Sequence, residues 1–361
     1  MTAIDELFQL GTSTWLDDLS RDRITTGNLD EIKAQKSVVG VTTNPAIFAK
    51  AMSVGDAYSE QLASLRETSS AADAAVYAMS VKDVKDACDL FADVYAATNG
   101  RDGRVSIEVD PRYAADEEKT VAQAAELWKL VGRDNVMIKI PATDESLPAI
   151  TASLAAGISV NVTLIFSVDR YRQVIAAYKE GIRRAAAAGK DVASIHSVAS
   201  FFVSRMDTEV DKRLELIGSD EALALRGRAG IANARLAYQV FSDEFADMAD
   251  LPAGANKQRP LWASTGVKNP DYPATMYVTE LAGPDTVNTM PEATIDAVLQ
   301  QGGLHGDTLT GTAGEAQQVF DQLNEVGIDI ADVVRVLERE GVDKFVDAWR
   351  ELLNSMEANL R

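Results

Sequence analysis

Short runs of β-branched and apolar residues recur along this chain of 361 residues, and stretches with helical periodicity lie between them. The predicted strands are residues 13–16, 38–41, 105–109, 136–140, 158–166, 195–200, 260–264 and 286–290. When strand, helix and strand alternate, neighbouring strands pair in parallel. The sequence therefore predicts an α/β fold, a single (β/α)8 TIM barrel, with an open doubly wound sheet as the alternative.

Two connections between predicted strands are much longer than the others. Residues 45–104 and 201–259 each contain helical patterns, and the tail beyond residue 313 is helical to its end. We interpret these segments as additions to one barrel, namely extra helices inserted between strands and at the C-terminus. We therefore expect residues 1–361 to form a single domain.

The composition limits the classes of molecule that the protein is expected to bind. The 35 basic and 55 acidic residues give a net charge of −20, which opposes long-range attraction to nucleic acid or to an anionic membrane. Any phosphate-binding site must therefore be local. The single cysteine, Cys88, excludes an internal disulfide, and the start of the chain lacks the features of a signal peptide. We expect a cytoplasmic protein.

Three of the predicted strands carry an apolar face and a polar face. The apolar faces are Val105, Ile107 and Val109; Val136, Ile138 and Ile140; and Ile158, Val160, Val162 and Leu164. The opposite faces carry Ser106 and Glu108; Met137 and Lys139; and Ser159, Asn161 and Thr163. Such alternation is common in antiparallel sheets with one solvated face, but the intervening helices favour a parallel barrel.

If the apolar faces pack on helices, then Lys139, Glu108, Asn161 and Thr163 converge inside the barrel. Burial of unpaired charges is costly, so these residues are expected to have a function. Desolvation disfavours the ammonium form of a lysine, whereas nearby carboxylates oppose that effect. A neutral amine can attack a carbonyl and form an iminium, which promotes cleavage of a carbon–carbon bond without a metal. The alternative for Lys139 is a structural ion pair with Glu108.

Several segments together resemble the signatures of the transaldolase family. They are 40-GVTTNPAIF-48, 105-VSIEVDPR-112, 136-VMIKIPAT-143, 158-ISVNVTLIFS-167, 198-VASFFVSRMD-207, 263-ASTGVKNP-270 and 281-LAGPDTVNTMP-291. The match covers about residues 12–300. The resemblance implies an eight-stranded barrel with a Schiff-base lysine on the fourth strand, where Lys139 lies.

The resemblance also implies catalytic roles at matching positions. Lys139 resembles the Schiff-base lysine, and Glu108 resembles the carboxylate that moves protons through a water molecule held with Thr163. Asp17 resembles the aspartate that takes the proton from the C4 hydroxyl of the substrate. The neighbouring Asp18 makes this alignment ambiguous by one position, and we favour Asp17 because Leu16 supplies the apolar residue usual before the catalytic aspartate.

Other positions resemble substrate-binding residues of the family. Asn44 and Asn161 match the amides that hydrogen-bond the sugar hydroxyls, and Ser200 matches the serine at the donor end of the ketose. Phe202 is a marker, because the related fructose-6-phosphate aldolases tend to have tyrosine at this position. Arg205 and Ser264 resemble phosphate ligands.

The sequence departs from the family pattern after Ser264. Many members have an arginine two residues later, whereas this chain reads 264-STGVK-268. We expect Lys268 to replace the guanidinium as a point charge, without bidentate geometry.

The sequence gives no support for a cofactor. His196 and His305 are the only histidines, and no Cys or His pair has the spacing of a metal site. No G-x-G-x-x-G motif opens a helix after the first strand, so a nicotinamide cofactor is not expected. Residues 306–312 resemble a P-loop only superficially, because the lysine is missing.

The expected function is transfer of a dihydroxyacetone unit from sedoheptulose 7-phosphate to glyceraldehyde 3-phosphate in the non-oxidative pentose phosphate pathway. The products are erythrose 4-phosphate and fructose 6-phosphate. The alternatives are an enzyme like fructose-6-phosphate aldolase, a pyridoxal-phosphate barrel and an inactive sugar-phosphate-binding module. The expected partners are sugar phosphates, and the expected oligomeric state is a monomer or homodimer.

Overall fold

The computed structural model describes residues 1–68 and 70–361, and eight parallel strands close a barrel in chain order. The barrel confirms the predicted fold class, and each strand overlaps its predicted segment. The strands are β1 Thr12–Leu16, β2 Gly40–Val41, β3 Arg104–Glu108, β4 Val136–Pro141, β5 Val160–Ile165, β6 Ser197–Phe202, β7 Arg259–Ala263 and β8 Thr286–Met290.

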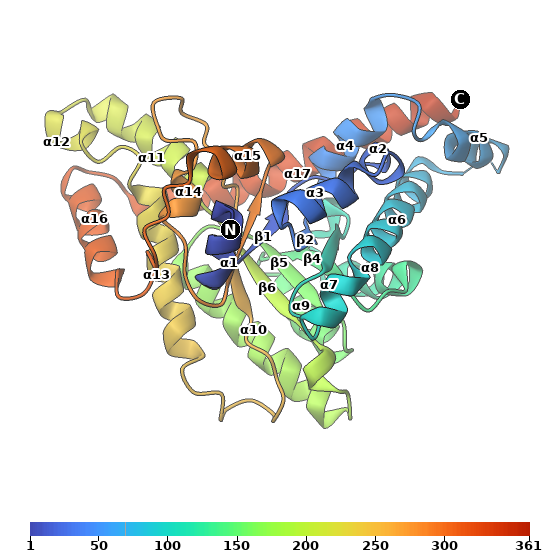
Figure 1. Cartoon of the computed structure of the whole chain (residues 1–361), viewed down its shortest axis with the longest axis horizontal. Coiled ribbons are helices and arrows are strands. Elements are labelled where there is room, and N and C mark those ends of the chain that lie inside the picture. Colours follow the sequence, from blue (N-terminus) through green and yellow to red (C-terminus); the bar gives the residue numbers. More distant parts are fainter. Residues whose placement is uncertain (69) are drawn as a thin grey trace.

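Helices surround this barrel (Figure 1), and several occupy the long connections after β2 and β6. Before β3 they are α1 Ala3–Gln9, α2 Arg21–Thr25, α3 Asn28–Lys36, α4 Pro45–Ser53, α5 Ser59–Glu67, α6 Ala72–Leu90 and α7 Ala92–Ala97. Between β3 and β7 they are the 3-10 helix η1 Pro111–Tyr113, α8 Glu117–Val131, α9 Ser146–Ala155, α10 Val168–Ala187, the 3-10 helix η2 Val192–Ser194, α11 Ser204–Ile217, α12 Asp220–Leu223 and α13 Ala229–Glu244. The remainder are α14 Met276–Thr279, α15 Glu292–Gln301, α16 Ala313–Glu325 and α17 Ile330–Leu360.

The two faces of the strands belong to different apolar clusters. On β4, Val136, Ile138 and Ile140 pack in the large cluster between strands and helices, whereas Met137 belongs to a second cluster that holds residues of four other strands, Trp15, Val198, Leu261 and Val287, and extends to helices. The outward apolar face predicted for β4 is therefore confirmed. Because side chains alternate along a strand, Lys139 points inward, as Met137 does.

One residue on β5 departs from the predicted alternation. Leu164 was expected on the outer face with Val160 and Val162, but it belongs to the second cluster, and a Cβ atom at Gly341 of α17 would lie 3.3 Å from its side chain. The pairing of β5 with β6 changes register between Val162 and Ile165, and Leu164 has a φ of 59°, in the left-handed region. This irregularity turns Leu164 towards α17 directly after Thr163, and a regular period of two cannot predict it.

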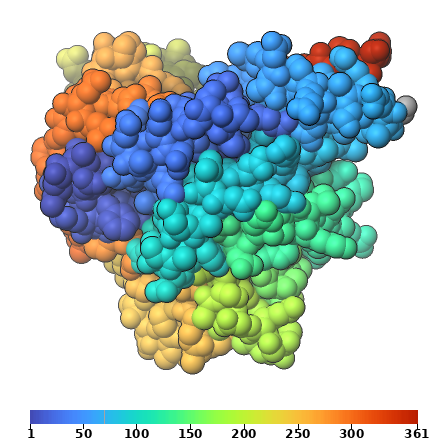
Figure 2. Space-filling view, turned by 45° about the vertical axis from the view of Figure 1, so that its right-hand side comes forward, coloured from blue at the N-terminus to red at the C-terminus, as the bar shows by residue number. Residues whose placement is uncertain are grey.

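Trp15 of β1 is fully buried, and its Nε1 donates a hydrogen bond at 2.9 Å to Asp102, which precedes β3. A Cβ atom at Gly40 would lie 2.7 Å from the Trp15 ring, so only glycine lets β2 approach the indole. Figure 2 shows the blue N-terminal segment lying against the orange segment that carries β8 and α15. This contact covers the side of the barrel where its first and last strands pair.

The helix α17 crosses one end of the barrel, from α11 towards α4 and α5 (Figure 1). It also packs against β5. A Cβ atom at Gly341 would lie 3.0 Å from the ring of Phe166, so this glycine allows the close approach. Within the described part of the chain, no helix is long and apolar enough to span a membrane.

Candidate functional site

The C-terminal ends of the strands surround a cavity of about 390 Å³. The active sites of (β/α)8 barrels lie at this end, where the loops after the strands converge. Eight of the residues predicted for the site line the cavity: Asp17, Asn44, Lys139, Ser200, Phe202, Arg205, Ser264 and Lys268. Glu108, Asn161 and Thr163 are buried beside them in the barrel.

Lys139 lies at the centre of this group and is only 5% exposed. It pairs in register with Glu108 on β3 and with Asn161 on β5, so the three inward side chains form one row. Its Nζ donates a hydrogen bond to the carbonyl oxygen of Thr43 at 2.9 Å and lies 3.7 Å from Glu108 Oε2. One weak ion pair and one carbonyl leave this amine accessible from the cavity.

Glu108 is 6% exposed, and neither of its carboxylate oxygens has a hydrogen-bond partner among the described residues. Burial raises the pKa of Glu108 to about 7, although the charge of Lys139 opposes this shift. The hydroxyl of Thr163, also buried, likewise lacks a partner within the described chain. A water molecule bonded to both side chains would satisfy these atoms.

The structure separates the two adjacent aspartates that the sequence left ambiguous. Asp17 lines the cavity and accepts a hydrogen bond from Thr42 Oγ1 at 2.7 Å. Burial raises the pKa of Asp17, and the positive charge of Lys139 partly offsets that effect. Asp18 instead pairs with Arg23 at 2.8 Å, outside the cavity lining. Only Asp17 is therefore placed to contact a molecule bound beside Lys139.

The predicted amides and the serine are held by hydrogen bonds. The side chain of Asn161 donates to Ser106 Oγ at 3.1 Å and accepts from Ser200 Oγ at 2.7 Å. Asn44 is the N-cap of α4, since its Oδ1 accepts from the amide of Ile47 at 3.0 Å. Its Nδ2 remains available to the cavity. These contacts fix the amide orientations before a substrate binds.

Positive groups gather at another part of the cavity wall. The Arg205 guanidinium lies 5.0 Å from the centre of the Phe202 ring, and its buried Nη1 has no hydrogen-bond partner in the described chain. The hydroxyls of Ser204 and Ser264 are 2.8 Å apart at the ends of β6 and β7. Lys268 makes no ion pair with any described residue. Such unsatisfied donors suit an oxyanion.

Gly266 occupies the position at which the sequence lacks the arginine usual in the family. A Cβ atom at Gly266 would lie 3.8 Å from Lys268 Nζ. The ammonium of Lys268 therefore lies near residue 266, and both residues line the cavity. Replacement of the arginine by Lys268 stays a prediction.

Sequence reasoning missed the residues that α17 contributes. Phe345, Glu340 and Lys344 line the cavity, and the Phe345 ring centre lies 5.9 Å from Lys139 Nζ and 6.0 Å from the Arg205 guanidinium. Helical periodicity predicted α17 but gave no sign that one of its faces covers the barrel. Thr42, the partner of Asp17, was also missed, although it lies within the quoted TTNP motif.

The arrangement offers an amine nucleophile, a carboxyl group with a pKa near neutrality and a second carboxylate. It also offers a cationic recess, which is the part of the cavity lined by Arg205, Ser264 and Lys268. No group of three or more His, Cys, Asp and Glu residues in the described chain is positioned to hold a metal ion. These parts suit covalent chemistry on a carbonyl compound that also carries an anionic group.

Comparison with known proteins agrees with this chemistry. The family model described as transaldolase/fructose-6-phosphate aldolase matches residues 14–356. The transaldolase of Mycolicibacterium paratuberculosis is 59% identical over 354 residues, which cover 97% of this chain and 95% of the relative. The transaldolase of Mycobacterium ulcerans is 60% identical with the same coverage. That of Mycobacterium leprae strain Br4923 is 59% identical and covered to 94%.

Proposed function

This chain belongs to the transaldolase/fructose-6-phosphate aldolase family, and from that premise we propose that it is a transaldolase that works through a Schiff base on Lys139. It transfers a dihydroxyacetone unit from sedoheptulose 7-phosphate to glyceraldehyde 3-phosphate, giving erythrose 4-phosphate and fructose 6-phosphate. The observation that carries the proposal is the buried Lys139, which lines a cavity together with Asp17, Arg205, Ser264 and Lys268.

The first step is attack of Lys139 Nζ on the C2 carbonyl of the ketose. Among the described residues, the close acceptors of this amine are the Thr43 carbonyl, at 2.9 Å, and the Glu108 carboxylate, at 3.7 Å. Loss of water from the carbinolamine gives an iminium, which accepts the electron pair of the C3–C4 bond when that bond breaks. No metal or organic cofactor is required in this scheme.

Glu108 moves the protons of Schiff-base formation and hydrolysis. A carboxyl group with a pKa of about 7 both donates and accepts protons near neutral pH. A water molecule between Glu108 and Thr163 would extend its reach to the carbinolamine oxygen. The unpartnered oxygens of these two side chains support this role.

Asp17 takes the proton from the C4 hydroxyl and so starts cleavage. The leaving aldehyde departs, and the enamine retained on Lys139 attacks the carbonyl of the acceptor. Asp17 then returns the proton to the new hydroxyl. The hydrogen bond from Thr42 orients the Asp17 carboxylate for both transfers. Asn44, Asn161 and Ser200 bind the hydroxyls of the three-carbon unit.

Arg205, Ser264 and Lys268 bind the phosphate of donor and acceptor. Burial lowers the pKa of the Arg205 guanidinium, although the charges of Glu340 and Asp17 oppose this shift. An arriving phosphate supplies the missing acceptors. The rings of Phe202 and Phe345 flank the same guanidinium and limit its contact with water.

A fructose-6-phosphate aldolase-like activity is the nearest rival, because the family model includes both activities. Purified protein should convert fructose 6-phosphate and erythrose 4-phosphate into glyceraldehyde 3-phosphate and sedoheptulose 7-phosphate. Without an acceptor aldehyde, release of free dihydroxyacetone should be much slower than transfer. Release at the same rate as transfer would instead assign the chain to the aldolase class.

The two carboxylates can be distinguished by rapid-quench experiments. Glu108→Gln should slow both formation and hydrolysis of the Schiff base, because the amide cannot carry the proton. Asp17→Asn should still form the covalent adduct but should not release the aldehyde. Asp18→Asn is the matched control and should behave like the unmodified enzyme. Accumulation of the same intermediate in the Asp17 and Glu108 variants would contradict this division of roles.

We further propose that residues 1–361 act as one domain, with the helices of residues 45–104 and 201–259 as insertions. The proposed setting is the cytoplasm, within the non-oxidative pentose phosphate pathway, and the proposed state is a monomer or homodimer. Sugar phosphates are the proposed partners, because the cationic recess lies within an otherwise strongly acidic chain.

A further inference from the structure

A second polar cavity, of about 330 Å³, lies at the N-terminal end of the barrel, opposite the candidate active site. Arg101, His196, Lys257, Arg259 and Asp285 line it. All five come from strand starts or from the segments just before them, since Arg259 opens β7, His196 precedes β6 and Asp285 precedes β8. None of them takes part in the chemistry proposed at the C-terminal end.

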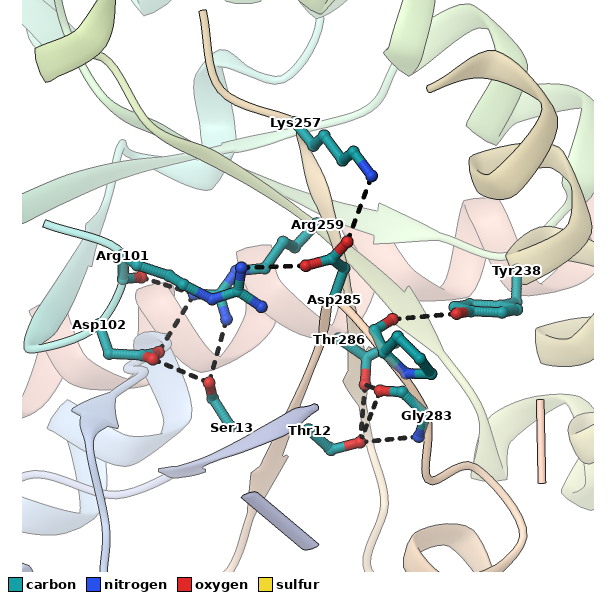
Figure 3. A network of polar contacts seen from close by, with 11 residues as sticks. Thr12, Ser13, Arg101, Asp102, Tyr238, Lys257, Arg259, Gly283, Asp285 and Thr286 are labelled. Atoms are coloured by element: carbon teal, nitrogen blue, oxygen red, sulfur yellow. Dashed lines mark hydrogen bonds and ion pairs between the residues drawn. The ribbon is translucent and has the colours of Figure 1, made fainter. Parts of the chain in front are cut away.

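The cations around this cavity outnumber the carboxylates. Asp285 is shared by Arg101 and Lys257, at 2.9 and 3.3 Å, and Figure 3 shows these two cations reaching it from different sides. Arg259 pairs with Asp102 at 3.1 Å. Arg101 and Lys257 therefore carry one charge more than their single carboxylate can neutralise. This local excess stands out in a chain whose net charge is −20.

A further cation beside the cavity, Arg104, has no carboxylate within salt-bridge distance in the described chain. Arg104 is fully buried, and its Nη2 has no hydrogen-bond partner among the described residues. A Cβ atom at Gly100 would lie 3.1 Å from that Nη2, 3.1 Å from Tyr95 Cε2 and 3.2 Å from His196 Nε2, so the three groups pack closely around Gly100. The free donor therefore lies near the imidazole that lines the cavity, with its guanidinium 4.9 Å from the centre of the Tyr95 ring. Buried donors of this kind are rarely left unsatisfied.

We infer that this end of the barrel carries a second anion-binding pocket, suited to the phosphate group of a small metabolite. Arg101 and Lys257 are partly exposed at its mouth, where their side chains can turn from Asp285 towards a ligand. Arginine and lysine together match the charge and the acceptor oxygens of a phosphate monoester. The volume is at the lower end of the range for small-molecule sites, which fits a phosphate attached to a few carbon atoms.

Histidine NMR provides a local test, because the chain has only two histidines, His196 and His305. Burial and the charges of Arg104 and Arg259 lower the pKa of His196 to about 3, so its ring is neutral at ordinary pH and should respond to a nearby anion. The protein with labelled imidazoles would be titrated with glycerol 3-phosphate and, separately, with glycerol at equal ionic strength. Glycerol 3-phosphate, but not glycerol, should shift the His196 resonance saturably.

Variants separate this pocket from the active site. The double variant Arg101→Ala with Lys257→Ala changes only partly exposed side chains and should weaken the His196 response at least about tenfold. Arg205→Ala, which alters the candidate active site, should leave the response unchanged. Inorganic phosphate should reproduce the shift, which would identify the phosphate group as the recognised part. A response that does not saturate, that glycerol also produces or that survives the double variant would overturn the inference.

Discussion

The two ends of the barrel bury charge in opposite ways. At the N-terminal end, Asp102 is 1% exposed and both of its oxygens accept hydrogen bonds. Oδ2 accepts from Ser13 Oγ at 2.9 Å. Oδ1 accepts from Trp15 Nε1 at 2.9 Å and from Arg259 Nη2 at 3.1 Å. Figure 3 shows the Asp102, Ser13 and Arg259 part of this network. At the C-terminal end, Glu108 is 6% exposed and neither of its oxygens is bonded within the described chain.

Burial alone therefore does not mark a catalytic carboxylate. A buried ion that is fully hydrogen-bonded holds the strands in register, and breaking its network is costly. Glu108 has no hydrogen-bond donor among the described residues and only an ion pair with Lys139 at 3.7 Å, so it recovers less of the cost of burial, and we infer that it persists because function requires it. Removal of a charged group at the C-terminal end should therefore reduce activity, whereas removal of one at the N-terminal end should reduce stability.

The largest effect is expected for Lys139→Ala. The variant should lose transfer activity by about ten-thousandfold or more, because no other amine can form the iminium. Its free energy of unfolding should fall by about 2 kcal/mol or less. The hydrogen bond to the Thr43 carbonyl and the ion pair with Glu108 are lost, but Glu108, whose pKa is already about 7, can take up a proton. Steady-state kinetics and urea unfolding measure the two quantities. Residual activity within about a hundredfold of the unmodified enzyme would remove Lys139 from the mechanism.

Asp102→Ala should give the reverse result. Loss of this carboxylate leaves Arg259 buried without its counter-ion and should lower the free energy of unfolding by about 3–5 kcal/mol. The control is Asp93→Ala, which breaks an exposed pair with Lys33 and should cost about 1 kcal/mol or less. Specific activity of the folded Asp102 variant should be retained. If Asp102→Ala and Asp93→Ala lower the free energy of unfolding equally, the Asp102 network does not stabilise the N-terminal end as proposed.

Glu108 should make stability depend on pH. Its folded pKa of about 7 lies above the usual value of 4.5, so its protonated form stabilises the fold at low pH and this contribution disappears as the pH rises through 7. Between pH 5 and pH 8 the unfolding free energy should fall on the order of 2–3 kcal/mol relative to Glu108→Gln. Exposed Glu118 provides the control substitution, Glu118→Gln. A constant difference across this range would argue against a raised pKa.

Lys268→Ala should have the smallest effect and should be selective for phosphorylated substrates. Loss of one charged hydrogen bond should raise KM for phosphorylated donors and acceptors by roughly 10- to 150-fold. Unphosphorylated glyceraldehyde should react as before, since its carbonyl lies near Lys139. Lys190→Ala, an exposed change after α10, serves as the control. If KM for fructose 6-phosphate stays within about twofold, Lys268 does not bind the phosphate.

The barrel and the row of Glu108, Lys139 and Asn161 could be predicted because both follow from regular periods. Alternation along parallel strands decides which side chains point inward, and the pairing register then aligns them. Leu164 was misplaced because a bulge depends on pairing with β6, which the sequence of β5 does not encode by itself.

Contacts between distant segments were beyond the reach of sequence patterns. Phe345 approaches Lys139 only because α17 crosses the barrel, and that path depends on the close packing of Gly341 against Phe166. The choice of Asp17 over Asp18 rested on resemblance, and its geometric support comes from Thr42 and Arg23, which lie on other segments. The cationic pocket at the opposite end likewise joins residues from several strand starts.

A covalent bond between Lys139 and the substrate can be trapped chemically. The protein would be incubated with fructose 6-phosphate, reduced with borohydride, digested and mapped by mass spectrometry. The proposal predicts one sugar-derived adduct, on the peptide that contains Lys139, and no adduct without substrate or in Lys139→Ala. An adduct on a different lysine, or full activity with no trapped adduct, would contradict it.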